Sequence, residues 1–326
     1  MATLKDVARI AKVSPSTVSY VLSGKKSVRP ETEKRVFDAV KALDYTPNLL
    51  ASGLKTNSSM TVGVIVCDLK QMFFAEMVKH IACALDKEGY CMILCDSEND
   101  SEKEKKHLQQ LLARNIDGLI IMGNGKNSGF EKLDIPIICI DRTFGESLTT
   151  VKTDNILGGM MGTRYLLQKG YRNILFVSVS GLRFTQERWN GYCSAMIEAD
   201  MADRITELQL EDLYIETAEK NMLEYLDQQE GSLGFDAVFC STDYIAIGVL
   251  RALKKKGIRV PEDVGVMGHD NIDFSGLTDP ALTTIGQHKE QIAAACVESL
   301  LKMARGKEQV PHQTLFAPYL VERNSC

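Results

Sequence analysis

Residues 3–22 read Thr3-Leu-Lys-Asp-Val-Ala-Arg-Ile-Ala-Lys-Val-Ser-Pro-Ser-Thr-Val-Ser-Tyr-Val-Leu22. Thr3 followed three residues later by Asp6 predicts a capping box at the start of a first helix. Ser14 and Pro15 then predict a second helix, because serine caps a helix and proline suits its first position. Two helices joined by a short turn, the second opening with small polar residues, indicate a helix-turn-helix whose second helix enters the major groove of DNA.

The rest of the N-terminal region predicts a third helix and a linker. Apolar residues at helical spacing predict a helix over 30–43, which Tyr45-Thr-Pro47 ends. The small, apolar segment 48–57 has no partner in a compact head, and we expect it to become helical only when it packs against a binding partner. We therefore divide the chain into a headpiece (1–46), a hinge helix and linker (47–60) and a body (61–326).

The net charge of −5 conceals an asymmetry between head and body. Residues 1–60 carry ten Lys/Arg and five Asp/Glu, a net charge of +5. Residues 61–326 carry 28 Lys/Arg and 38 Asp/Glu, a net charge of −10. A small basic region on a large acidic body is typical of a protein that binds an anionic polymer. Phosphate contacts supply much of the affinity of a DNA-binding protein.

The body predicts an α/β fold. Continuous apolar runs such as 61–67 and 118–122 predict strands buried on both faces, and they alternate with helical patterns. Two runs of this alternation predict two doubly wound parallel-sheet lobes. Ligands of such folds bind beyond the carboxyl ends of the strands, which here form the cleft between the lobes.

Composition and motifs exclude several classes of protein. No apolar run reaches the roughly 18 residues of a membrane helix, and the N-terminus lacks the apolar stretch of a signal peptide, so we expect a cytoplasmic protein without membrane contact. The nine cysteines form no Cys-x-x-Cys pair and mostly lie in apolar runs, which indicates reduced, buried thiols. The five histidines are dispersed, so we expect no metal site and no cofactor.

An enzyme finds little support in the sequence. The glycine-rich segment 123–129 has the wrong spacing for a dinucleotide fingerprint and lacks the Lys-Ser/Thr of a phosphate-binding loop. No Gly-x-Ser-x-Gly nucleophile elbow is present. Aspartates 68, 96 and 141 follow strands, but nothing pairs them with a nucleophile.

Residues 3–65 resemble the DNA-binding region of the LacI/GalR (lactose-repressor/galactose-repressor) family of bacterial transcription factors. The matching motifs are residues 4–11, 13–19, 29–36, 43–48 and 51–54. Segments of the body, among them 73–76, 117–121, 140–142, 188–192, 239–243 and 268–271, resemble the effector domain of the same family, which has the periplasmic-binding-protein fold.

The resemblance implies which head residues contact DNA. Pro15, Ser16 and Tyr20 match the positions that read bases in the major groove, and Thr17 and Ser19 match phosphate contacts. Leu54 matches the hinge leucine that wedges between central base pairs in the minor groove. Such a wedge partly unstacks a base step, kinks the duplex and admits more protein surface, although a simple packing role for this leucine is the alternative.

The cleft residues are predicted in the same way. Arg188 offers a rigid fork of donors, and Asp270 follows an apolar strand and can accept two hydrogen bonds. By resemblance, the effector site also includes Phe73, Phe74, Asp141, Phe184, Thr242 and Gln287. Two structural alternatives stand beside these roles: Arg188 pairs with Asp141, and Phe74 belongs to the core.

We interpret the chain as a homodimeric repressor that binds a near-palindromic double-stranded operator and responds to a small molecule, a sugar or sugar derivative. A nucleobase acting as corepressor is the alternative effector. A solute-binding protein would share the body, but the basic head opposes it. An architectural DNA-binding protein would share the hinge, but it would not need a cleft.

Overall fold

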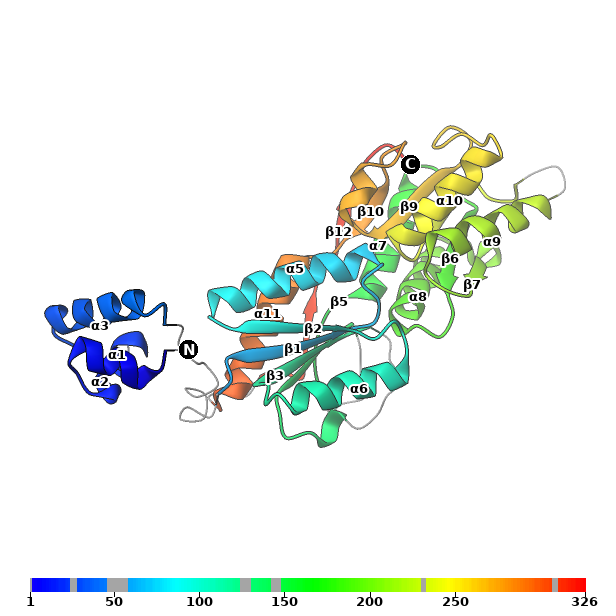
Figure 1. Cartoon of the computed structure of the whole chain (residues 1–326). Helices are drawn as coiled ribbons and strands as arrows, with labels where there is room; N and C mark the ends of the chain where they lie inside the picture. Colours follow the sequence, from blue (N-terminus) through cyan, green and yellow to red (C-terminus); the bar gives the residue numbers. More distant parts are fainter. Residues whose placement is uncertain are drawn as a thin grey trace. The chain divides into compact units, whose positions relative to one another are not determined.

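The computed structural model describes residues 2–23, 28–45, 58–123, 130–141, 148–229, 233–306 and 310–326. The chain divides into two compact units, the head (Met1–Ser59) and the body (Met60–Cys326), both drawn in Figure 1. Most of the predicted hinge, including Leu54, lies outside the described residues.

The head is formed by three helices. They are α1 (Leu4–Ala11), α2 (Pro15–Ser23) and α3 (Pro30–Ala42). The predicted capping box is confirmed, because the Thr3 hydroxyl accepts from the Asp6 amide at 3.3 Å and the Asp6 carboxylate accepts from the Thr3 amide at 3.0 Å. One side of each helix contributes to a shared core of small apolar residues: Val7, Ala8, Ala11, Val18, Val21, Val36 and Ala39.

The body has two lobes, each built on a six-stranded sheet. The first lobe holds β1 (Thr61–Val66), α5 (Met72–Lys87), β2 (Cys91–Asp96), α6 (Ser101–Leu112), β3 (Gly118–Met122), η1 (Phe130–Lys132), β4 (Ile137–Ile140), β5 (Thr149–Thr153), α11 (Lys289–Ala304) and β11 (Gln313–Phe316). The second holds α7 (Asn155–Gln168), β6 (Ile174–Val179), α8 (Arg183–Glu198), η2 (Ala202–Arg204), β7 (Thr206–Leu210), α9 (Ile215–Asp227), β8 (Ala237–Cys240), α10 (Asp243–Lys255), β9 (Gly265–Asp270), η3 (Asp273–Gly276), β10 (Thr283–Gly286) and β12 (Tyr319–Val321).

The strand orders are β11-β5-β4-β3-β1-β2 and β12-β10-β9-β8-β6-β7. The described pairs are parallel except for β10 with β12. The prediction of two doubly wound lobes is confirmed. The chain passes between the lobes three times, after β5, after β10 and after β11, so each lobe contains segments that are distant in sequence.

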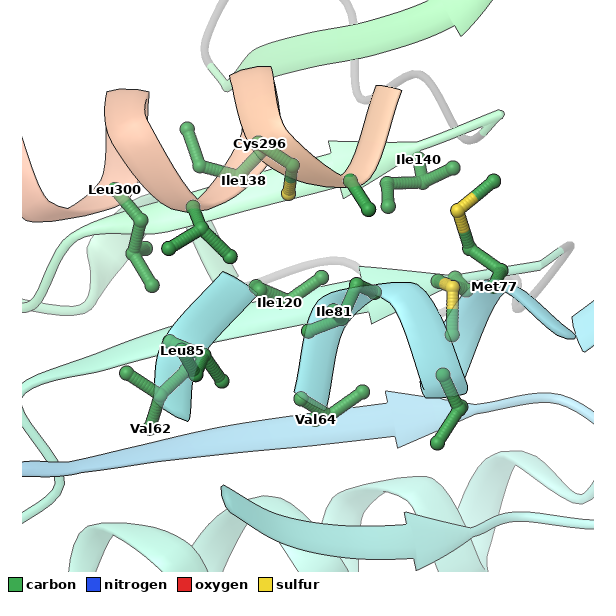
Figure 2. Packing of buried hydrophobic residues seen from close by; sticks show 14 of the residues in the cluster. Val62, Val64, Met77, Ile81, Leu85, Ile120, Ile138, Ile140, Cys296 and Leu300 are labelled. Atoms are coloured by element: carbon green, nitrogen blue, oxygen red, sulfur yellow. The ribbon is translucent and has the colours of Figure 1, made fainter. Parts of the chain in front are cut away.

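Alternate residues of each strand face opposite helical layers. In β1, Val62 and Val64 point to the face covered by α5 and α11, while Ile65 joins the cluster on the α6 side. Figure 2 shows the first of these layers, in which Ile81 and Leu85 of α5 lie near Cys296 and Leu300 of α11. A segment from the C-terminal end of the chain thus completes the core of the first lobe.

In the second lobe, α7 and α8 approach closely because glycines line their contact. A Cβ added at Gly159 would lie 2.0 Å from the Arg188 carbonyl oxygen, and one at Gly191 would lie 2.1 Å from that of Ile156. This contact fixes the height of α8 over the sheet. It therefore also positions Arg188, which the sequence places in the effector site.

Some sequence predictions of element boundaries are wrong. The sequence pattern predicts helices from residues 75 and 186, but α5 and α8 begin three residues earlier, at Met72 and Arg183, because neither Gln71 nor Leu182 forms the side-chain cap that would mark a start. The pattern does not predict strands β5, β7, β10, β11 and β12, which have only three to five residues each and, apart from β12, contain polar side chains. Four of the nine free cysteines are buried, but Cys83 and Cys91 are exposed.

None of the described helices is both long enough and apolar enough to cross a lipid bilayer.

We expect Gly159→Ala to destabilise the body. Helix propensity alone would favour alanine by about 1 kcal/mol, but overpacking against a backbone oxygen costs about 1–3 kcal/mol and outweighs it when neither helix can shift. Urea unfolding of the full chain measures the change. Gly276→Ala is the control, because the nearest atoms to its added Cβ are 3.9 Å away; an equal effect of both substitutions would contradict the close-approach argument.

Candidate functional site

The second helix of the head divides its side chains between the core and the solvent. Ser14 caps α2 by accepting from the Thr17 amide at 3.1 Å. Val18 and Val21 are buried in the head core. Pro15, Ser16 and Tyr20 are exposed, as residues that read base edges must be, and Thr17 and Ser19 are partly exposed.

Seven of the eight predicted effector residues line one small cavity in the body. They are Phe73, Phe74, Asp141, Phe184, Arg188, Thr242 and Asp270. The cavity volume is about 20 Å³, which is room for about one water molecule. The lobes are thus closed around these side chains, and a larger ligand enters only when the lobes move apart.

The ends of strands and the starts of helices bring these residues together. Asp141 directly follows β4, and Asp270 is the last residue of β9. Thr242 caps α10 by accepting from the Ile245 amide at 3.2 Å. Because the carboxyl ends of parallel strands meet at one edge of each sheet, the two lobes present their polar groups to each other.

Arg188 is the centre of the cavity wall, with only 2% of its surface exposed. Its Nε donates to Asn155 Oδ1 at 2.8 Å, its Nη1 donates to the Ser241 carbonyl, and its Nη2 lies 3.0 Å from Asp270 Oδ1. Its guanidinium lies 4.9 Å from the centre of the Phe184 ring, within range of a cation–π contact. The structure therefore pairs Arg188 with Asp270 rather than with Asp141.

The two carboxylates of the cavity differ in their surroundings. Burial would raise the pKa of Asp270, but the Arg188 guanidinium and hydrogen bonds outweigh it and lower that pKa. Burial raises the pKa of Asp141 to about 6, although Arg188 opposes the shift. Asp141 Oδ1 has no hydrogen-bond partner among the described residues. This oxygen is consequently an acceptor that a ligand could satisfy.

The structure places Gln287 behind the cavity and not on its wall. Its Nε2 donates to Asp270 Oδ1 at 2.7 Å, and its Oε1 accepts from the Thr153 hydroxyl at 2.6 Å. Both ends of the amide are therefore occupied by protein groups. Gln287 thereby orients Asp270 and links two of the segments that cross between the lobes, while its predicted contact with the effector stays a prediction.

Sequence reasoning missed two residues of the cavity wall, Gln71 and Gly123. Gly123 follows β3 with a φ of +102°, and a Cβ there would lie 2.4 Å from the Cys67 sulfur, so only glycine fits. Gln71 precedes α5 and is 9% exposed. A systematic search of all residues that follow the strands would have found both.

Contacts between the lobes hold the cleft closed. Glu76 of α5 accepts from the Asp273 amide of the second lobe at 2.8 Å, and Lys289 of α11, in the same lobe as Glu76, donates to the same carboxylate. The Tyr244 hydroxyl donates to the Lys70 carbonyl at 2.8 Å. Tyr214 donates to Asp68. The three contacts other than that of Lys289 join groups on opposite lobes, so they must break when the cleft opens.

A search of the described residues found no group of three His, Cys, Asp or Glu side chains that could hold a metal ion.

Comparison with known proteins identifies the family. The profile of "Bacterial regulatory proteins, lacI family" matches residues 3–48, and that of "Periplasmic binding protein-like domain" matches residues 163–326. The HTH-type transcriptional repressor PurR of Histophilus somni (strain 129Pt) is 35% identical over 340 residues, covering 100% of this chain and 99% of the relative. The chain belongs to the LacI family.

Solved structures agree with this assignment. A LacI-type regulator from Alkaliphilus metalliredigens QYMF, complexed with D-xylulofuranose, is 28% identical with a TM-score of 0.73, covering 82% of this chain and 98% of that one. The lac repressor dimer bound to operator and the anti-inducer ONPF is 24% identical with a TM-score of 0.86, covering 99% and 98%, and shares the fold. This LacI-family chain is a DNA-binding transcriptional repressor, and the expectation that it is not an enzyme is confirmed by its relatives.

We expect Asp270→Asn to destabilise this LacI-family body by about 3 kcal/mol, because it leaves the buried Arg188 cation without its partner. Asparagine tolerates the positive φ of 114° about as well as aspartate, so backbone strain changes little. Chemical unfolding provides the measurement. Glu198→Gln breaks only the exposed pair with Arg164 and should cost about 0–1 kcal/mol. A loss for Asp270→Asn no larger than this control would show that the buried pair is dispensable.

Proposed function

We propose that this repressor binds a near-palindromic operator as a homodimer in the cytoplasm and is controlled by a small molecule in its cleft. One observation carries the proposal: the chain joins a helix-turn-helix head to a body whose strand ends converge on one closed cavity. The lac repressor, solved as a dimer on operator with an anti-inducer, supports the dimeric assembly. Because two heads then face two half-sites, the operator is a near-palindrome.

The head contributes two kinds of DNA contact. Pro15, Ser16 and Tyr20 read base edges in the major groove, and Thr17 and Ser19 contact phosphates. Leu54, which lies outside the described residues, wedges into the minor groove at the centre of the operator. Base contacts specify the sequence, while phosphate contacts fix the register of the protein on the duplex.

The cavity suits a sugar or sugar derivative as effector. Phe73, Phe74 and Phe184 offer apolar faces, and the unpaired oxygen of Asp141 accepts a hydroxyl proton. Arg188 presents a planar donor edge between them. CelR, solved as a complex with cellobiose, is 27% identical over the whole of this chain and supports a carbohydrate effector.

A purine-type effector is the second candidate. A relative named HTH-type transcriptional repressor PurR is 35% identical to this chain over its full length. The three phenylalanine rings would also stack on a flat heterocycle, and Asp141 would accept from a ring N–H. The two effector classes are separated by direct binding measurements.

The response couples the cleft to the hinges. Ligand binding moves the lobes, breaks or remakes contacts such as Glu76 with the Asp273 amide, and changes the separation of the two hinges in the dimer. The hinge helices then form or melt, and operator affinity follows. Coupling of this kind is reciprocal and typically amounts to about 1–3 kcal/mol.

Selection of operators from a random DNA pool tests the proposed function. The full chain should enrich a near-palindromic sequence, and its affinity should fall steeply with salt because the basic head releases counterions. Sugars and purines added in turn should change that affinity, and the sign of the change distinguishes inducer from corepressor. A pool without any symmetric consensus would refute the operator assignment.

We expect Tyr20→Ala to weaken binding to the enriched operator by about 1–3 kcal/mol while leaving binding to random DNA nearly unchanged, because a base contact is lost. Fluorescence anisotropy with both duplexes measures this difference. Ile10→Ala, which removes another exposed apolar side chain of the head, should leave both affinities intact. Equal losses of Tyr20→Ala on both duplexes would remove this residue from the reading positions.

Effector binding should weaken as the pH falls. Burial raises the pKa of Asp141 to about 6, so this carboxylate is ionised at pH 7 and mostly protonated at pH 5. Because a protonated carboxyl is a poorer hydrogen-bond acceptor, the affinity for the effector should drop about tenfold between pH 7 and pH 5. Burial lowers the pKa of His269 to about 4, so this neighbour stays neutral across the range. Calorimetric titration should show that the effector affinity of Asp141→Asn does not change with pH. If the affinity of this variant still depended on pH as in the wild type, the effect would belong to another group, such as Asp243, whose pKa burial raises to about 7.

A further inference from the structure

A second, larger cavity lies beside the effector cavity. Its volume is about 560 Å³, and it lies between residues 97–104, which follow β2 in the first lobe, and residues 211–214, which follow β7 in the second. Gln71 lines both cavities. We call this larger cavity the outer compartment.

The outer compartment has one apolar wall and one polar wall. Val179, Leu182 and Leu213 of the second lobe form the apolar wall. The first lobe contributes hydroxyl and carboxylate side chains, among them Ser97 and Glu104. A ring with a C–H face and hydroxyl groups on its edges matches both walls at once, because apolar surface is removed from water while donors meet acceptors.

The charge of the compartment selects against anions. Glu98, Asp100, Glu104, Glu211 and Asp212 line it, and its described lining includes no lysine or arginine. Lys103, the adjacent cation, is already paired with Glu98 at 2.6 Å. In the effector cavity, likewise, Arg188 is paired with Asp270. Among the described residues of both linings, a phosphate group would therefore meet like charges and no unpaired cation.

Gln71 supplies the contact between the two cavities. Its side chain is 9% exposed, and its amide makes no hydrogen bond with any described residue. An amide that lines both cavities and makes no such bond offers its N–H donors and its carbonyl oxygen to whatever fills the space beside it. A ligand that extends from one cavity into the other passes this amide.

We propose that the effector has two parts and that the outer compartment binds an uncharged, hydroxylated ring attached to the part held by Arg188 and Asp141. The inference rests on the proposed function, because it assigns the second half of the same ligand. Such a ring is the second sugar of a disaccharide or the ribose of a nucleoside. Phosphorylated forms of either ligand are rejected.

Calorimetric titration of the full chain with two matched series tests the proposal. The probes are glucose, cellobiose and glucose 6-phosphate in one series, and guanine, guanosine and guanosine monophosphate in the other. In the series that the protein recognises, and counting the fused guanine base as one ring system, the two-ring, uncharged member (cellobiose or guanosine) should bind at least tenfold more tightly than both the single-ring member (glucose or guanine) and the phosphorylated member. The recognised series identifies the source of the ring.

Two variants localise the effect. Gln71→Ala should reduce the ratio of two-ring to single-ring affinity at least threefold, and it removes no helix cap because the Gln71 side chain makes none. Glu211→Arg, at an exposed position of the compartment, should raise the affinity for the phosphorylated probe. Glu224→Arg makes the same change of charge on an exposed residue of the second lobe outside the compartment and should alter neither ratio.

Several outcomes would overturn the proposal. They are equal affinity for single-ring and two-ring probes, tightest binding of a phosphorylated probe by the unmodified protein, and no binding of any probe while operator binding persists. In each case the repressor function stands and only the outer-compartment assignment falls. Loss of operator recognition itself would instead refute the proposed function.

Discussion

A buried cation organises the sensor body. The Arg188 guanidinium is almost fully removed from water, and such a charge is tolerated only when its donors are satisfied and a carboxylate neutralises it. Asn155, Ser241 and Asp270 meet these demands. The partners come from three different segments of the second lobe, so satisfying one side chain also fixes the start of α7, the end of β8 and the end of β9. The effector cavity takes its shape from this arrangement.

The same requirement explains why the cavity is closed and selective. With Arg188 already paired, Asp141 Oδ1 is a buried oxygen of the cavity wall without a hydrogen-bond partner among the described residues, and the Gln71 amide lies on the same wall. A ligand gains most by supplying donors and hydroxyl groups to them. The contacts of Glu76 with the Asp273 amide and of Tyr244 with the Lys70 carbonyl join the two lobes, and each is a single hydrogen bond.

The fold and most of the effector cavity could be predicted from the sequence because they depend on strong local signals. The apolar runs of β1 and β3 and the motif around Arg188 are of this kind. Strand β5 could not be predicted, because Lys152 interrupts it and becomes acceptable only when Glu187 of α8 pairs with it at 2.7 Å. The position of Gln287 behind Asp270 likewise depends on a contact with Thr153, which is 134 residues away in sequence.

The three passages of the chain between the lobes have a consequence for biosynthesis. One helical layer of the first lobe stays incomplete until α11 has left the ribosome, and the second lobe lacks its edge strand β12 until that later segment is synthesised. The head, by contrast, is synthesised first and needs nothing from the rest of the chain to fill its core. During translation, a folded DNA-binding module therefore precedes a sensor that gains its native packing only after α11, β11 and β12 have been synthesised, and both lobes complete their folding together.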